Sequence, residues 1–111
     1  MDVLIFSLCH FPNNDASSVR NLYLGKMIQS AGYGEVCICG ISNTGEKLVG
    51  TYDSVSYSLY FGRQRKYIEF AKKMIEKYKE IKIIMINGVP VNSFLYLKKQ
   101  AIKRNIILMT D

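Results

Sequence analysis

The 111-residue sequence has few of the residues that build metal or disulfide sites: one histidine, three cysteines and no tryptophan. Cys9, Cys37 and Cys39 all lie in apolar runs, and an odd number in such places predicts buried free thiols in a reducing compartment. One residue separates Cys37 from Cys39, whereas zinc-binding pairs usually have about two to four residues between them. We therefore predict neither a disulfide framework nor a metal site.

Several motifs of phosphate chemistry and targeting are also missing. The first apolar segment is not followed by the G-x-G-x-x-G pattern of dinucleotide-binding folds, and the sequence has no P-loop. No paired-carboxylate site is evident. The beginning of the sequence lacks the basic stretch of a signal peptide. No apolar run approaches the roughly 18 residues that a membrane-spanning helix needs, so we expect a cytoplasmic protein.

The length and composition fit one domain, residues 1–111, with 49% apolar and 22% charged residues. The charge is unevenly spread. Residues 1–62 carry three basic and five acidic residues, whereas residues 63–104 carry twelve basic and three acidic ones. The basic part is either a solvated helix face or a contact for an anionic membrane or nucleic acid. It contains no recognised nucleic-acid motif, which disfavours nucleic acid as a partner.

Strand-like and helix-like segments alternate along the chain. The strand-like segments are apolar runs at residues 3–9, 36–41, 55–60, 81–86 and 106–109. Helical periodicity covers a segment that begins near Ala16 or Ser17 and ends at Gly32, and also residues 63–80 and 91–104. Residues 43–50 are expected to form a loop. The alternation predicts an α/β fold: a Rossmann-like, three-layer domain with a mostly parallel sheet of about five strands in the order 3-2-1-4-5.

That order places a ligand crevice between the first and fourth strands, where the loops at residues 10–18 and 87–90 meet. The first loop runs into a helix N-terminus, which attracts anions through its free N–H groups and its dipole. The candidate substrate- or phosphate-binding residues are Asn13, Asn14, Ser17, Ser18, Arg20, Asn87 and Gly88.

Three of these candidates, Ser17, Ser18 and Arg20, also have a purely structural interpretation. Asp15, Ser17 or Ser18 can simply cap the helix, and Arg20 can be solvated.

Two further side chains at the crevice also allow two interpretations. Asn87 can bind a hydroxyl-rich ligand, or it can form a turn before glycine. His10 is a weak candidate for a catalytic base or a hydroxyl ligand, because it lies at the mouth of the crevice, although a lone histidine is more often structural.

Short motifs along nearly the whole chain resemble those of a known enzyme family. Phe11-Pro12 lies in the loop after the first strand, and Gly32-Tyr33-Gly34-Glu35-Val36 stands where that family has a helix ending "GHEV". Residues 81–88 and 105–111 resemble the fourth and fifth strands of the same family. The family is glycosyltransferase family 4, whose members have the GT-B fold.

In that family, two Rossmann-like domains face each other across a cleft. The N-terminal domain mainly binds the acceptor, and the C-terminal domain binds the nucleotide-sugar donor and carries an E-x7-E motif. The resemblance implies that residues 1–111 are an incomplete N-terminal half of an enzyme that transfers a sugar from a nucleotide sugar to a glycan or lipid-linked acceptor. It implies no cofactor, and it places Ser17, Ser18 and Arg20 near the donor phosphates.

The sequence departs from the family pattern at the same loops. Asn13-Asn14-Asp15-Ala16 replaces the usual glycine pair, and Asn87 and Thr110 stand where the family often has histidine. The missing C-terminal domain means that we expect no turnover from this chain alone. The basic residues from 63 to 82 would rest on an anionic membrane at its inner face. The alternative is a non-catalytic Rossmann-like module for binding or interaction.

Overall fold

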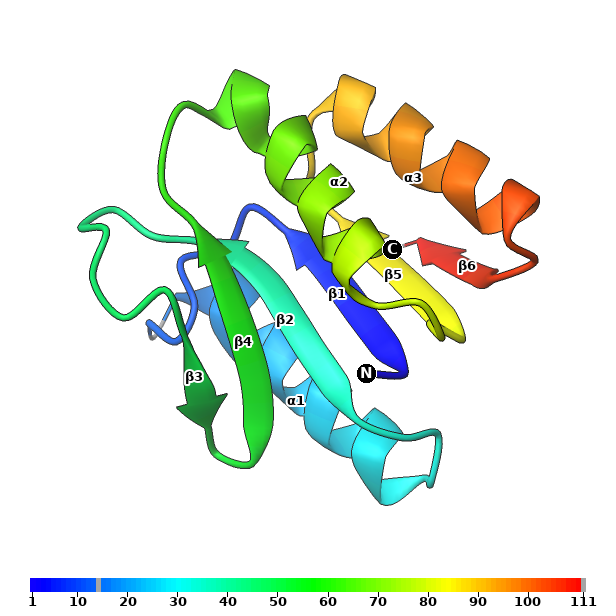
Figure 1. Cartoon of the computed structure of the whole chain (residues 1–111). Helices are drawn as coiled ribbons and strands as arrows, with labels where there is room; N and C mark the ends of the chain where they lie inside the picture. Colours follow the sequence, from blue (N-terminus) through cyan, green and yellow to red (C-terminus); the bar gives the residue numbers. More distant parts are fainter. Residues whose placement is uncertain (14, 111) are drawn as a thin grey trace.

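The computed structural model describes residues 1–13 and 15–110, which form a mostly parallel, open sheet covered by helices (Figure 1). The strands are β1 (Val3–Ser7), β2 (Val36–Ile41), β3 (Val49–Tyr52), β4 (Val55–Tyr60), β5 (Ile83–Asn87) and β6 (Ile107–Thr110). Their order in the sheet is β3-β4-β2-β1-β5-β6. Every neighbouring pair is parallel except β3 and β4, which are antiparallel.

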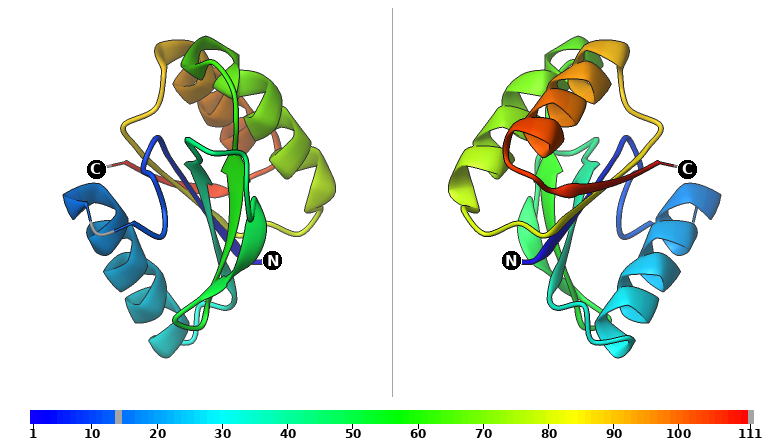
Figure 2. Two further views of the ribbon diagram at one scale, coloured as in Figure 1. Left: turned by 90° about the vertical axis from the view of Figure 1, so that its left-hand side faces the viewer. Right: turned by 90° about the vertical axis from the view of Figure 1, so that its right-hand side faces the viewer.

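The helices cover both faces of this sheet (Figure 2). Helix α1 (Ala16–Ser30) packs on one face, over a core that includes Val3, Ile5 and Ile38. The 3-10 turn η1 (Gln64–Lys66), α2 (Tyr67–Lys77) and α3 (Val91–Lys103) lie on the other face. All residues of β1 and β2 are buried, because both of their faces are covered. The predicted α/β architecture with a mostly parallel sheet is therefore confirmed.

The predicted strand count is wrong by one strand, and the strand order changes accordingly. Part of the expected loop continues into β3, which pairs with β4 at the edge of the sheet. The connection is a tight turn in which Asp53 and Ser54 have positive φ angles of 48° and 69°. The β3 side chains are largely exposed, so this strand has no apolar alternation by which the sequence could reveal it.

The long helix expected over residues 63–80 is also shorter in the structure, because α2 ends at Lys77. Tyr78 is already extended, with φ −110° and ψ 109°. The guanidinium of Arg104 donates to the carbonyls of Ile75, Tyr78 and Lys79 at 2.8–3.0 Å. These bonds give hydrogen-bond donors to carbonyls at the end of α2 that would otherwise lack them. Ending the helix there therefore costs little free energy.

The three cysteines are free and buried, as predicted. Burial raises the pKa of the Cys9 thiol, which keeps it neutral and unreactive at ordinary pH. Tyr67 is fully buried and donates its hydroxyl hydrogen to the Cys39 carbonyl, which ties α2 to β2. Within the described ranges, no helix has both the length and the apolar character required to cross a bilayer.

Candidate functional site

The strand order reverses at β1 and β5, and in an open α/β sheet a ligand crevice is expected outside the carboxyl ends of such strands. β1 lies between β2 and β5. The chain leaves β1 through α1 on one face, whereas it reaches β5 through α2 on the opposite face (Figure 2). At such a reversal, the loops that follow the two central strands turn away from each other and leave a ligand crevice between them.

Two asparagines join α1 to the carboxyl end of β5. The amide nitrogen of Asn87 donates to Oδ1 of Asn21 at 2.8 Å, and the amide nitrogen of Asn21 approaches Oδ1 of Asn87 at 3.4 Å. Asn21 also lies 3.4 Å from the sulfur of Cys9 and is only 1% exposed. The backbone N–H of Leu8 donates to the Gly88 carbonyl at 3.1 Å. A polar network therefore joins α1 and the chain that follows β1 to the carboxyl end of β5.

Asn21 was not among the residues predicted from the sequence. The available signal is its place on the buried face of α1, which it shares with Ser18 and Gly25. A buried asparagine needs hydrogen-bond partners, so its presence on that face indicates a polar contact in the interior. Asn87 ends β5, and both polar atoms of its amide contact Asn21, which is neither of the two roles considered for it from the sequence.

The N-terminus of α1 is closed by its own cap. Oδ1 of Asp15 accepts from the Ser18 N–H at 2.9 Å, and Oδ2 accepts from the Ser18 hydroxyl at 3.2 Å. Ser18 is 1% exposed, whereas Ser17 and Arg20 are exposed in the first turns of the helix. The Asp15 carboxylate already complements the helix dipole, so a phosphate at this end would face a like charge. Asn14 lies outside the described residues.

The other predicted residues divide between two hollows. His10 and Asn13 line a cavity of about 380 Å³ between the loop after β1 and the loop from 42 to 47. Asn87 and Gly88 line a smaller hollow of about 230 Å³ at the ends of β5 and β6, together with Phe94 and others. Neither of these hollows is lined by Ser17, Ser18 or Arg20. The candidate residues thus lie along one edge of the sheet without forming a single pocket.

The cavity at His10 contains side chains that the sequence did not single out. Glu46 and Lys47 line it beside the half-buried imidazole, and buried side chains of β2 and β4 form its base. These loop residues carry no recognisable motif, and only the fold brings them near His10. In the part of the chain that the structure describes, no three histidine, cysteine or acidic side chains gather as a metal site would require.

Comparisons of the chain with models of protein families, with curated proteins and with solved structures find no match. The geometry of the crevice and the short sequence motifs are thus the support for a functional proposal.

Proposed function

We propose that this chain is the N-terminal, acceptor-side part of a nucleotide-sugar glycosyltransferase of the GT-B type, with a Rossmann-like fold. The observation that carries the proposal is the joined pair of loops after β1 and β5, at the reversal of strand order. The family-like motifs agree with this arrangement, because Val36 begins β2 and residues 81–88 include β5.

In this proposal the chain holds the acceptor, and the second domain holds most of the donor. Ser17 and Arg20 are exposed at the start of α1, where they would meet the donor diphosphate across the cleft. The carboxylate of Asp15 weakens that end of the helix as a complete phosphate site, so the donor would need further positive charge from the second domain. His10 lies at the carboxyl end of β1, where an imidazole can accept the proton of an acceptor hydroxyl.

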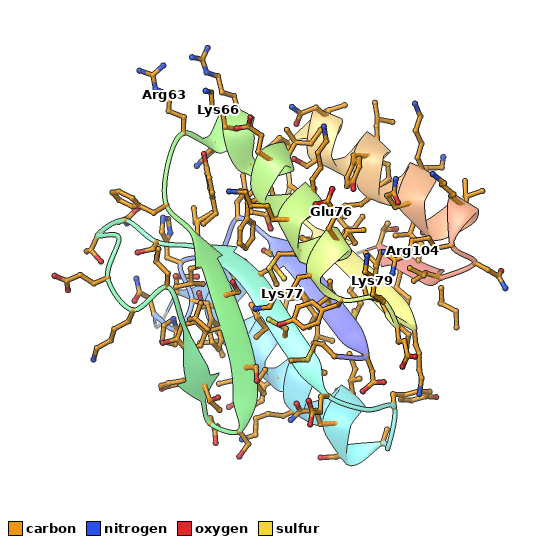
Figure 3. The ribbon with its side chains drawn as sticks, in the orientation of Figure 1. Arg63, Lys66, Glu76, Lys77, Lys79 and Arg104 are labelled. Atoms are coloured by element: carbon orange, nitrogen blue, oxygen red, sulfur yellow. The ribbon has the colours of Figure 1, made fainter. Side chains whose placement is uncertain are left out.

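Contact with an anionic membrane is a further part of the proposal. Because η1, α2 and α3 cover one face of the sheet, the basic half of the sequence becomes one layer of the molecule. Figure 3 shows Arg63 and Lys66 near one end of this layer and Lys77 and Lys79 near the other.

Lys66→Gln with Lys73→Gln should weaken sedimentation with phosphatidylglycerol vesicles more than Lys26→Gln with Lys47→Gln, which removes the same charge elsewhere. Equal binding by both double variants would remove the membrane from the proposal.

One observation fits the alternative, a non-catalytic binding module, as well as it fits a two-domain enzyme. Ile102 of α3 and Ile107 and Met109 of β6 are 73%, 61% and 47% exposed, and β6 is an edge strand of the sheet. Exposed apolar side chains beside an edge strand are typical of a surface that another polypeptide segment covers. Such a segment can belong either to a second domain or to a separate partner.

The mass of the native polypeptide separates the two functions. An antibody raised against residues 1–111 would isolate the protein from its source, and mass spectrometry would give its intact mass. The glycosyltransferase proposal predicts a polypeptide of at least twice 12.7 kDa, because a second α/β domain must follow. A native mass of 12.7 kDa would contradict it and favour the binding module.

A further inference from the structure

The cavity of about 380 Å³ beside His10 has a buried apolar base. Ile41, Tyr57 and Leu59 are 6–8% exposed and come from β2 and β4. A cavity of this volume falls in the usual range of small-molecule sites, which combine an apolar lining with a few polar groups.

One wall of this cavity is held in place by hydrogen bonds within the loop that follows β2. Oγ of Ser42 accepts from the N–H groups of Thr44 and Gly45 at 3.2 and 3.1 Å. Oγ1 of Thr44 accepts from the N–H of Glu46 at 3.2 Å. Gly45 has a φ of +75°, and a Cβ atom at this position would lie 3.2 Å from the ring of Phe61. These contacts fix the wall before any ligand arrives, which lowers the entropy cost of binding.

The opposite wall is equally fixed. Phe11 is 3% exposed, and its ring lies 5.8 and 5.6 Å from the ring centroids of Tyr52 and Tyr57. The N–H of Asn13 donates to the His10 carbonyl at 2.8 Å. The N–H of Ile41 donates to the Cys9 carbonyl at 2.9 Å, which joins this wall to β2.

The rim of the cavity carries balanced charge and many neutral polar groups. Glu46 and Lys47 contribute one charge of each sign, and Asn13, Asn43 and Thr44 contribute amides and a hydroxyl. An anion such as phosphate would face the Glu46 carboxylate, with a single lysine to balance it. A sugar ring is uncharged, and it presents hydroxyl groups at its edge and C–H groups on its faces. The amides can bond those hydroxyls while the apolar base packs against the ring.

We propose that this cavity binds one neutral pyranose ring. The inference rests on the proposed function only where it assigns that ring to the acceptor, because the binding itself follows from the cavity. A single ring makes few contacts, so its Kd should be on the order of 1 mM.

His10 is the only histidine, so its imidazole resonances report on this cavity without overlap. The experiment is an NMR titration of the chain with glucose, galactose, mannose and N-acetylglucosamine, and separately with sodium phosphate. We expect saturable shifts of the His10 resonances with at least one sugar and none with phosphate.

Asn43→Ala should weaken sugar binding about fivefold through the loss of a hydrogen bond. Asn92→Ala, an exposed position on α3, should leave the affinity unchanged.

Three results would overturn this inference: no saturable shift with any sugar, a response to phosphate alone, or equal affinities for the wild type and Asn43→Ala. The outcome is separate from that of the glycosyltransferase proposal. Sugar binding with a native mass of 12.7 kDa would leave the cavity assigned and the transferase rejected. A two-domain native protein without sugar binding would do the reverse.

Discussion

At the scale of single residues, the amide pair of Asn21 and Asn87 matters most to the crevice, because it joins α1 to the end of β5. Asn87→Ala should lower the free energy of unfolding by about 1–3 kcal/mol, since it leaves Oδ1 of the buried Asn21 without its donor. Urea denaturation measures this loss. A double-mutant cycle with Asn21→Ala should show a coupling of about 0.5–3 kcal/mol between the two positions.

Ser30→Ala is the matched control for this cycle, because Ser30 is an exposed polar residue on α1, the helix that carries Asn21. It should change the free energy of unfolding by less than about 0.5 kcal/mol. Additive losses in the Asn21 and Asn87 variants would show that the two amides do not stabilise the crevice together.

Asp2 provides a pH-dependent contribution to stability. Its Oδ2 accepts from the Glu35 N–H at 3.0 Å, and its Oδ1 lies 3.5 Å from Nζ of Lys82. Chiefly because of the hydrogen bond from Glu35, the pKa of Asp2 falls below its ordinary value of 3.8. The resulting stabilisation is present above that value and is lost as the pH falls through the lowered pKa of the folded state.

Asp2→Asn should therefore lose less stability than the wild type between about pH 6 and about pH 3. Urea denaturation at a series of pH values measures the two curves. Parallel curves for the two proteins over that range would contradict the assigned role of the Asp2 carboxylate.

The contrast between Asn21 and Ser18 shows what the sequence can reveal about individual residues. The capping role of Asp15 and Ser18 was one of the alternatives available from sequence, because caps follow from local spacing. The partnership of Asn21 with Asn87 joins positions that are 66 residues apart, so only the fold brings them together.

At the scale of whole elements, Arg104 determines where α2 ends. Figure 3 shows it beside Lys79, near the end of that helix. Arg104→Met should lower the free energy of unfolding by about 1–3 kcal/mol, because three carbonyls lose a charged donor. Arg104→Lys should restore only part of the loss, since one ammonium group cannot match the planar fork of a guanidinium.

Lys103→Met is the control variant, because it also replaces a long, positively charged side chain by methionine, at the exposed neighbour of Arg104. It should change the free energy of unfolding by less than about 0.5 kcal/mol. Hydrogen exchange at the last turn of α2 gives a second measurement. Equal exchange in Arg104→Met and Lys103→Met would show that Arg104 does not anchor the helix.

The buried strands were predictable because their apolar runs are continuous, and α3 was predictable from its periodicity and end signals. The position of α1 followed from its end signals, but its buried face carries Ser18, Asn21 and Gly25, whereas Val19, Tyr23 and Met27, which recur at helical spacing, are exposed. β3 was missed because its stability comes from pairing with β4 and from a tight turn, neither of which requires apolar alternation. The end of α2 was misplaced because Arg104, which satisfies its carbonyls, follows it by more than 20 residues.

At the scale of the whole molecule, the fold sorts charge and chemistry onto different surfaces. The basic half of the sequence forms one layer on the sheet, whereas the joined loops and the cavity at His10 lie at its carboxyl edge. The general α/β plan follows from sequence, but the cavity depends on the loop from 42 to 47, whose position only the folded chain defines.

The most direct measurement of the central claim is the release of nucleoside diphosphate by the native polypeptide that contains this chain. The assay supplies UDP-glucose, UDP-N-acetylglucosamine or GDP-mannose as donor, with glycan and lipid extracts of the source as acceptors. A glycosyltransferase should release nucleoside diphosphate from at least one donor and transfer labelled sugar to the extract. Absence of release from all three donors by the folded native polypeptide would contradict the proposed function.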